Sequence, residues 1–105
     1  AYKMQTSLDR GLRAVSDPTR REILRTVAVT ESSAGDIASR FSMTRPAVSQ
    51  HLTALRKAGL VRVRAMAQQR LYSADAEGLE ALFNEMERFW EQVFEPESVN
   101  GNESA

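Results

Sequence analysis

The sequence predicts a mainly helical domain with one small β-hairpin, and three observations support this class. Apolar residues recur at helical spacing, for instance at Val48, Leu52 and Leu55. Two short segments, 60–64 and 69–73, instead alternate polar with apolar residues, as strands exposed on one face do. The chain has 105 residues, which suits one domain with a modest core that a partner subunit would help to stabilise.

The first two predicted helices meet at Asp17-Pro18, because this pair ends one helix and caps the next. Apolar residues recur from Met4 to Val15 in the first helix. The second helix should bury its aliphatic residues and expose its arginines, which are Ile23, Leu24 and Val27 on one face and Arg20, Arg21 and Arg25 on the other.

A short helix, a three-residue turn and a longer helix should follow. Ser33, with Asp36 three positions later, predicts the start of a short helix that ends near Phe41. Residues 42–44 form the turn, and the longer helix is expected from about Arg45 to Ala58, with Thr44 as its cap and Gly59 as a left-handed C-cap. This arrangement is the helix-turn-helix pattern.

The longer helix of this pair presents a polar face suited to DNA. Hydroxyl, carboxamide and cationic groups can hydrogen-bond base edges and phosphates in a major groove. We expect Ser49 and Gln50 to read bases and Arg45 either to read a base or to hold the backbone. His51 would donate to a phosphate or, alternatively, be a satisfied structural imidazole. The other predicted DNA-binding residues of this segment are Thr44, Thr53 and Arg56.

The alternating segments form a hairpin, or wing. Its tip, residues 65–68, lacks the glycine that a tight two-residue turn prefers, so we expect a longer or mobile loop. Arg62, Arg64 and Arg70 would line the hairpin, and we expect the two nearest the tip, Arg64 and Arg70, to contact DNA. The alternative is that they are solubilising charges on an edge strand.

The last helix is predicted from near Asp75 until Glu95-Pro96 and carries a wide apolar stripe. This stripe holds more aromatic surface than a small domain covers alone, which favours packing against a second copy over a ligand pocket at Phe89, Trp90 and Phe94. The glutamates of this helix should form a solvated face. The predicted dimer interface comprises Leu8, Leu12, Leu82, Met86, Phe89, Trp90 and Val93.

The formal net charge is zero, but the charges are divided along the chain. Residues 1–72 hold 13 Lys and Arg against 5 Asp and Glu, whereas residues 73–105 hold 1 against 9. A basic face of this size would attract phosphates, and the acidic end would face away from DNA. The chain has no cysteine and no apolar run near 18 residues, so we expect a cytoplasmic protein without thiolate metal ligands.

Several segments together resemble the ArsR-type winged-helix transcriptional repressors. They are 12–24 (LRAVSDPTRREIL), 45–52 (RPAVSQHL), 58–61 (AGLV) and 70–72 (RLY), in the same order and spacing. The resemblance covers roughly residues 8–95. It implies a dimeric winged helix-turn-helix with the element order α-α-α-α-β-β-α, in which residues 45–51 contact an operator.

One departure from that family concerns metals. Many of its members sense metal through a Cys-x-Cys pair where this chain has 35–38 (GDIA), or through a histidine-carboxylate site on the last helix. This chain has no cysteine and one histidine, His51, so metal sensing is not carried over and no cofactor is expected. It is closer to the cysteine-free members with a Phe-Trp pair, here Phe89-Trp90, whose inducer cannot be inferred.

We therefore expect a winged-helix DNA-binding domain over residues 1–95, including both dimerisation helices, and a polar, disordered tail at 96–105. The function expected is a homodimeric transcriptional regulator, a repressor at an inverted-repeat operator on double-stranded DNA. The alternative is a protein-interaction module on the same scaffold that does not bind DNA. Enzymatic function is not expected, because the chain has neither a glycine-rich phosphate-binding loop nor a plausible pair of a nucleophilic residue and a histidine.

Overall fold

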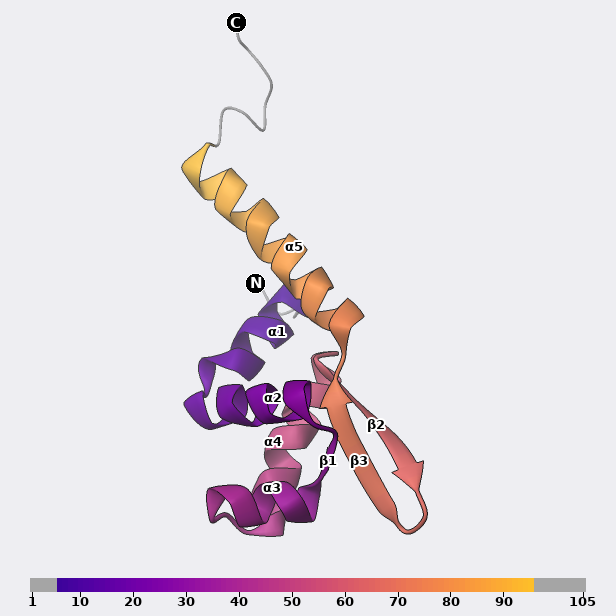
Figure 1. Ribbon diagram of the computed structural model, residues 1–105. Helices are drawn as coiled ribbons and strands as arrows, with labels where there is room; N and C mark the ends of the chain where they lie inside the picture. The colour runs from indigo at the N-terminus through magenta and orange to yellow at the C-terminus, as the bar shows by residue number, and fades with distance from the viewer. Residues whose placement is uncertain (1–5, 96–105) are drawn as a thin grey trace, which may run out of the picture.

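The computed structural model describes residues 6–95, so Met4 and the predicted tail lie outside the described residues. Figure 1 shows the hairpin gathered together with the shorter helices, and a long C-terminal helix that extends away from them. The predicted order of helices and hairpin is confirmed, and one short strand is added. The elements are α1 Ser7–Ser16, α2 Pro18–Val29, β1 Ser32–Ser33, α3 Ala34–Phe41, α4 Arg45–Lys57, β2 Val61–Met66, β3 Gln69–Ala74 and α5 Ala76–Phe94.

Each helix begins directly after a polar residue that caps it. A side-chain oxygen accepts a hydrogen bond from a main-chain N–H of the first turn, which satisfies a donor that the helix itself leaves unpaired. The caps of α2, α3 and α4 are the predicted ones, and Pro46 lies in the first turn of α4, where no main-chain N–H donor is needed. The capping residues of the five helices are Thr6, Asp17, Ser33, Thr44 and Asp75.

The three strands form an antiparallel sheet in the order β1-β3-β2. The prediction of a longer loop at the hairpin tip was wrong, because Met66 pairs with Gln69 and a two-residue turn joins the strands. Ala67 takes the left-handed conformation there, with φ of 56°. This conformation costs a residue with a side chain roughly 1–2 kcal/mol, which the regular pairing along both strands can offset. β1 was missed, since its two serines show no alternation.

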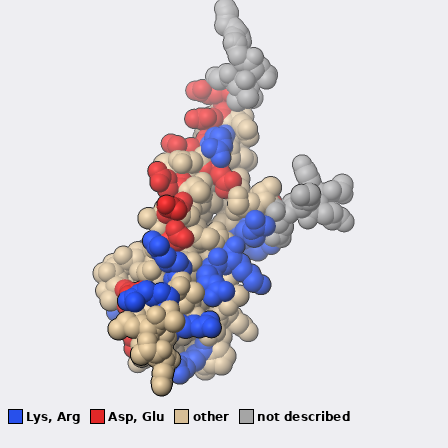
Figure 2. Space-filling model, turned by 90° about the vertical axis from the view of Figure 1, so that its right-hand side faces the viewer, with Lys and Arg blue, Asp and Glu red and all other residues tan. Residues whose placement is uncertain are grey.

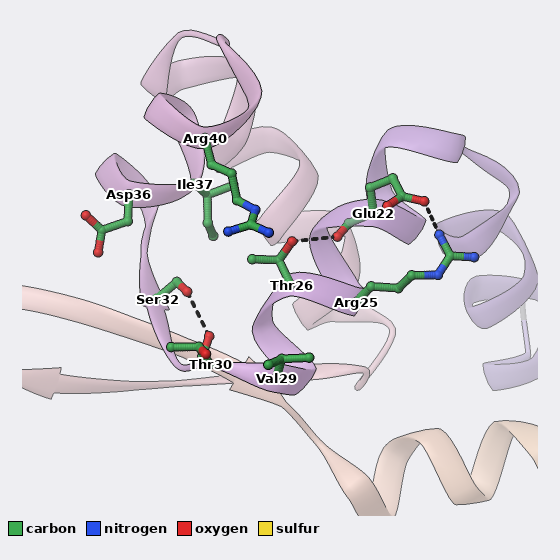
Figure 3. Close-up of a pocket in the computed structure, with 9 residues that line it drawn as sticks. All are labelled: Glu22, Arg25, Thr26, Val29, Thr30, Ser32, Asp36, Ile37 and Arg40. Carbon is green, nitrogen blue, oxygen red and sulfur yellow. Dashed lines mark hydrogen bonds and ion pairs between the residues drawn. The ribbon is translucent and has the colours of Figure 1, made fainter.

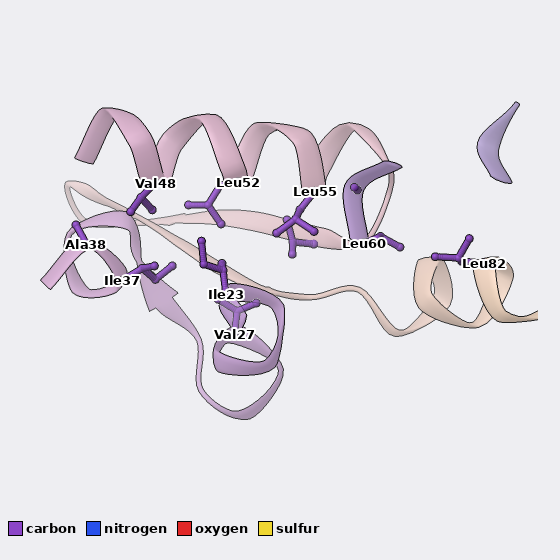
Figure 4. Packing of buried hydrophobic residues seen from close by; sticks show 11 residues of the cluster. Ile23, Val27, Ile37, Ala38, Val48, Leu52, Leu55, Leu60 and Leu82 are labelled. Carbon is purple, nitrogen blue, oxygen red and sulfur yellow. The ribbon is translucent and has the colours of Figure 1, made fainter. Parts of the chain in front are cut away.

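The core lies beneath α4 and joins it to α2, α3 and the start of β2 (Figure 4). Ile23, Ile37, Val48 and Leu55 are completely buried, and Leu52 is 1% exposed. Val48, Leu52 and Leu55 are the three residues whose spacing predicted the inward face of α4. Close packing of this kind fixes the rotation of α4 about its axis, and therefore fixes which of its residues face the solvent.

The C-terminal end of α4 closes with the predicted left-handed glycine. Gly59 has φ of +80°, and the N–H groups of Gly59 and Leu60 donate to the carbonyls of Arg56 and Leu55, which is a Schellman motif. The first turn of α5 lies directly on this motif. A Cβ on Gly78 would be 1.7 Å from the carbonyl oxygen of Gly59, so only glycine fits there.

α5 is attached to the domain mainly at its N-terminal end, where it also packs against α1 (Figure 1). Leu82 was predicted at a dimer interface, but the structure places it in the core of the protomer, 9% exposed and against Gly11. Periodicity alone did not distinguish these locations, because Leu82 belongs to the same stripe as the exposed residues further along α5. Within residues 6–95, no helix is sufficiently long and apolar to span a membrane.

Candidate nucleic-acid interface

The outward face of α4 is free of covering protein. Ser49, Gln50 and Thr53 are exposed, as the helical periodicity predicted, because the buried apolar residues of α4 lie on the other side of the helix. Their hydroxyl and carboxamide groups form no hydrogen bond within the described part of the chain. These are short polar groups on a rigid helix, which is the arrangement that reads base edges in a major groove.

Arg45 begins α4 and folds its side chain back toward the start of α3. A Cβ on Gly35 would lie 2.5 Å from Nη2 of Arg45 and 3.2 Å from Nε, so the guanidinium occupies the space that a side chain at position 35 would take. A cleft of about 400 Å³ opens beside it, between α3, α4 and the wing. Its lining residues are Ser33, Ala34, Arg45, Ser49, Gln68, Gln69, Arg70 and Tyr72.

The pleat of the wing separates the two arginines predicted to contact DNA. Ala65 pairs with Arg70 and Val63 pairs with Tyr72, so Arg70 lies on the hairpin face that lines the cleft. Arg64 lies on the other face, where its Nε and Nη2 donate to the carboxylate of Glu31 at 2.7 and 2.8 Å. Of the two, Arg70 is thus available to a phosphate, whereas Arg64 is neutralised by a carboxylate.

The pairing with Glu31 changes both titration equilibria. The hydrogen bond from Arg64 holds the pKa of Glu31 below its usual value, and the same bond raises the pKa of Arg64. The carboxylate therefore stays ionised at neutral pH and keeps the guanidinium in place. Sequence reasoning could not find this contact, since the residues are 33 positions apart.

His51 does not lie on the open face of α4. Its side chain is 20% exposed, and its Nδ1 is 3.4 Å from Nη1 of Arg20 and 4.0 Å from the carboxylate of Asp17. Arg20 was predicted to point outward, but this was wrong, because its Nε and Nη2 donate to the carbonyls of Ala14 and Arg13 at the end of α1. These contacts favour the structural alternative for His51 over the phosphate donor.

The charge division of the sequence is also a division in space. Figure 2 shows Lys and Arg over the lower part of the molecule and Asp and Glu along the long helix. Among the cations, Arg45, Arg56 and Arg70 are exposed and have no carboxylate partner within residues 6–95. A surface of this sign attracts nucleic-acid phosphates, and the acidic helix would be repelled from them.

A second groove, of about 430 Å³, lies between α2 and α3 and receives no residue from α4 or the hairpin. Figure 3 shows Arg25 directed at Glu22, with which it forms an ion pair, and Arg40 extended toward Thr26. Two carboxylates and two guanidiniums line this groove, so it offers no net charge to an ionic ligand. In residues 6–95 no cluster of three or more potential metal ligands was found.

The apolar stripe of α5 is exposed from Phe89 onward. Phe89 and Trp90 are 43% and 46% exposed, and Phe94 is 73% exposed. The Trp90 ring contacts both phenylalanine rings, with centroids 5.2 Å from Phe89 and 5.6 Å from Phe94. Of the other predicted interface residues, Leu12 and Val93 are exposed, and Leu8 and Met86 are partly buried. A continuous aromatic patch of this kind marks an interaction surface.

A winged helix-turn-helix with this polar face defines a class of transcriptional regulators, and the comparisons with known proteins agree. A profile described as "Bacterial regulatory protein, arsR family" matches residues 17–63, which span α2 to β2. An HTH-type transcriptional regulator of Mycobacterium tuberculosis is 42% identical over 84 residues, which cover 80% of this chain and 78% of the relative. The chain belongs to the ArsR family of bacterial transcriptional regulators.

Other relatives and solved structures agree with this assignment. The transcriptional repressor SdpR of Bacillus subtilis is 36% identical over 73% of this chain and 86% of its own length. An ArsR-like regulator from Rhodococcus sp. RHA1 superposes with a TM-score of 0.75 at 31% identity, covering 83% of this chain and 82% of that one. The homodimeric winged helix-turn-helix DNA-binding domain Mb0332 of Mycobacterium bovis shares the fold, with a TM-score of 0.67 at 22% identity over 98% of this chain and 99% of that one.

Proposed function

We propose that the chain is a sequence-specific DNA-binding repressor that acts as a homodimer on an inverted-repeat operator. The observation that carries this proposal is the free polar face of α4, held in one orientation by buried Val48, Leu52 and Leu55. Ser49 and Gln50 would contact bases, while Thr44, Thr53, Arg56 and Arg70 would hold the backbone. Repression is the function named for the relative SdpR, whereas the relative HlyU of Vibrio cholerae is named as a transcriptional activator, so reporter expression in the presence of the chain tests the direction.

The dimer is supported by the exposed stripe on α5. A second copy that packs its own α5 and α1 against this stripe would cover Trp90 and Phe89, and a two-fold axis would bring the same patch from both copies together. The two α4 helices would then enter successive major grooves roughly 34 Å apart, which requires half-sites about one helical turn apart. The homodimeric Mb0332 domain has the same fold and supports this assembly.

The first experiment is a binding selection from a random-sequence duplex library, followed by titrations at several salt concentrations. The proposal predicts enrichment of an inverted repeat and an affinity that falls steeply with salt, with a log–log slope of about −0.9 for each phosphate neutralised. A protein-interaction module on this scaffold would enrich no sequence and show no such slope. Either of those results would reject the proposal.

A second experiment tests the residues that contact bases. Gln50→Ala should relax the preference at one base position per half-site and weaken the operator complex by about tenfold, because a bidentate contact to a base is lost. Gln92→Ala makes the same truncation on exposed α5 and should leave binding unchanged. If the selection returns an unaltered base preference for Gln50→Ala, another residue reads that position.

A further inference from the structure

We propose that the cleft between α3, α4 and β3 binds one phosphate of the DNA backbone, and that Gly35 is the residue that allows Arg45 to take part. This inference rests on the proposed DNA-binding function and deepens it. It also decides between the two roles that the sequence left open for Arg45, a base contact or a backbone contact.

The first argument is the position of the Arg45 guanidinium. It lies against the first turn of α3, within 2.5 Å of where a Cβ on Gly35 would be, instead of extending outward from α4 beside Gln50. An arginine that reads guanine must reach the base edge in the groove with both nitrogens. A guanidinium folded back on α3 would instead lie at the border of the DNA major groove, where the backbone phosphates are.

The second argument is the charge of the cleft. Arg45 and Arg70 line it from α4 and β3, and within the described part of the chain neither has a carboxylate partner. Two guanidiniums that line one cleft make its potential positive, which favours an anion there. The side-chain amide of Gln69 on the same lining can donate a further hydrogen bond to a phosphate oxygen.

An arginine on the wing differs from the two at the cleft, because it has a carboxylate partner. Arg64 comes from the neighbouring strand, but its guanidinium is held by Glu31 on the opposite face of the hairpin. Arg25 on α2 is similarly paired with Glu22. Arg64 and Arg25 are thus compensated by carboxylates, whereas the two arginines at the cleft are not, so the cleft can receive an external anion.

The test is Gly35→Ala, which acts on Arg45 without altering it. Alanine is a better helix former than glycine, and the only side chain it displaces is the flexible end of Arg45, so the Tm should be equal or higher. DNA affinity should nevertheless fall by about three- to tenfold, equally on the selected duplex and on a random-sequence duplex of the same length. Ser39→Ala, on the exposed side of the same helix, is the matched control and should leave affinity unchanged.

A double-mutant cycle isolates the mechanism. In an Arg45→Ala background, Gly35→Ala should cause no further loss, because the group it displaces is already absent. Arg45→Ala itself should reduce the magnitude of the salt slope by about 0.9, as expected for one phosphate contact. An unchanged affinity in Gly35→Ala, additive losses in the double variant or an altered base preference would overturn the inference while DNA binding itself stands. A wild-type chain that binds neither duplex would overturn the proposed function and this inference with it.

Discussion

The helix-turn-helix unit and the long helix α5 differ in where they keep their apolar side chains. In the first, Ile37, Val48 and Leu55 are completely buried by their own protomer. On α5, the apolar residues from Phe89 onward are exposed, and Phe89, Trp90 and Phe94 form a line of contacting rings. The charges differ too, since the first region is basic and the second acidic.

This difference indicates which region buries its apolar surface within its own chain. Burial of apolar surface is the main favourable term in folding, and the helix-turn-helix unit obtains it without help. The far half of α5 would obtain it from the second copy in the proposed dimer. One region therefore presents polar groups on a fixed scaffold, while the other presents apolar groups that remain to be covered. Four substitutions test this distinction, from the largest expected effect to the smallest.

Leu52→Ala should destabilise the protein most, by about 2–5 kcal/mol, because it removes a buried side chain and leaves a cavity. Chemical denaturation followed by circular dichroism measures this loss. Val29→Ala truncates an aliphatic side chain that is 86% exposed and should change the free energy of unfolding by less than about 0.5 kcal/mol. Equal effects of the two substitutions would contradict the packing described for α4.

Trp90→Ala should weaken the dimer rather than the protomer. A buried tryptophan at an interface typically contributes at least 2 kcal/mol, so the dimer dissociation constant should rise by about thirtyfold or more. Sedimentation equilibrium gives this constant, and operator affinity should fall together with it. Gln92→Ala, on another face of α5, is the control. A Trp90→Ala protein that dimerises as tightly as the wild type would place the interface elsewhere.

Asp17→Ala should lower the Tm by about 5 °C at neutral pH, because the cap of α2 is lost. The main-chain N–H of Arg20 is the largest of the contacts that hold the pKa of Asp17 below its usual value. This stabilisation is therefore present above the ordinary aspartate pKa near 3.9 and is lost as the pH falls through the lower pKa of the folded state.

Asp17→Asn is the matched variant, because asparagine also caps a helix but does not titrate. Its Tm should lie between those of Asp17→Ala and the wild type at neutral pH, and its difference from the wild type should shrink in acid below about pH 4. A difference that stays constant down to pH 2 would show that the charge of Asp17 contributes nothing to the cap.

Glu31→Gln should have the smallest effect and should increase DNA affinity. It releases Arg64 from its carboxylate partner, and a free guanidinium on the wing can reach a phosphate, so we expect a gain of about two- to fivefold at low salt. Glu22→Gln makes the same charge change on α2, where it releases Arg25. Equal gains from both substitutions would indicate a general effect of net charge and no contact by Arg64.

The features that the sequence predicted well are local ones. Thr44 and Ser33 cap the residues three positions ahead of them, and Gly59 closes the helix that precedes it, so neighbouring residues suffice to predict them. The features missed depend on segments that only the fold brings together. Glu31 reaches Arg64, and Arg20 reaches His51, across 33 and 31 positions.

The same division applies to the candidate site. Helical periodicity was sufficient to place Ser49 and Gln50 on the open face of α4. It was not sufficient to assign Arg45, whose direction depends on the absence of a side chain at Gly35 in a different helix. Helical periodicity also could not distinguish buried Leu82 from the exposed residues of the same stripe. The burial of each residue depends on how far along α5 the contact with α1 extends.

The close approach of Gly78 to Gly59 has a mechanical consequence. The main chain of α5 contacts the main chain at the end of α4 directly, and no side chain lies between them that could change rotamer and absorb a displacement. A rotation of α5 about its first turn would therefore be transmitted directly to the last turn of α4. In the proposed dimer on DNA, the pairing geometry at the far end of α5 and the angle at which α4 meets DNA would thus be coupled through this joint.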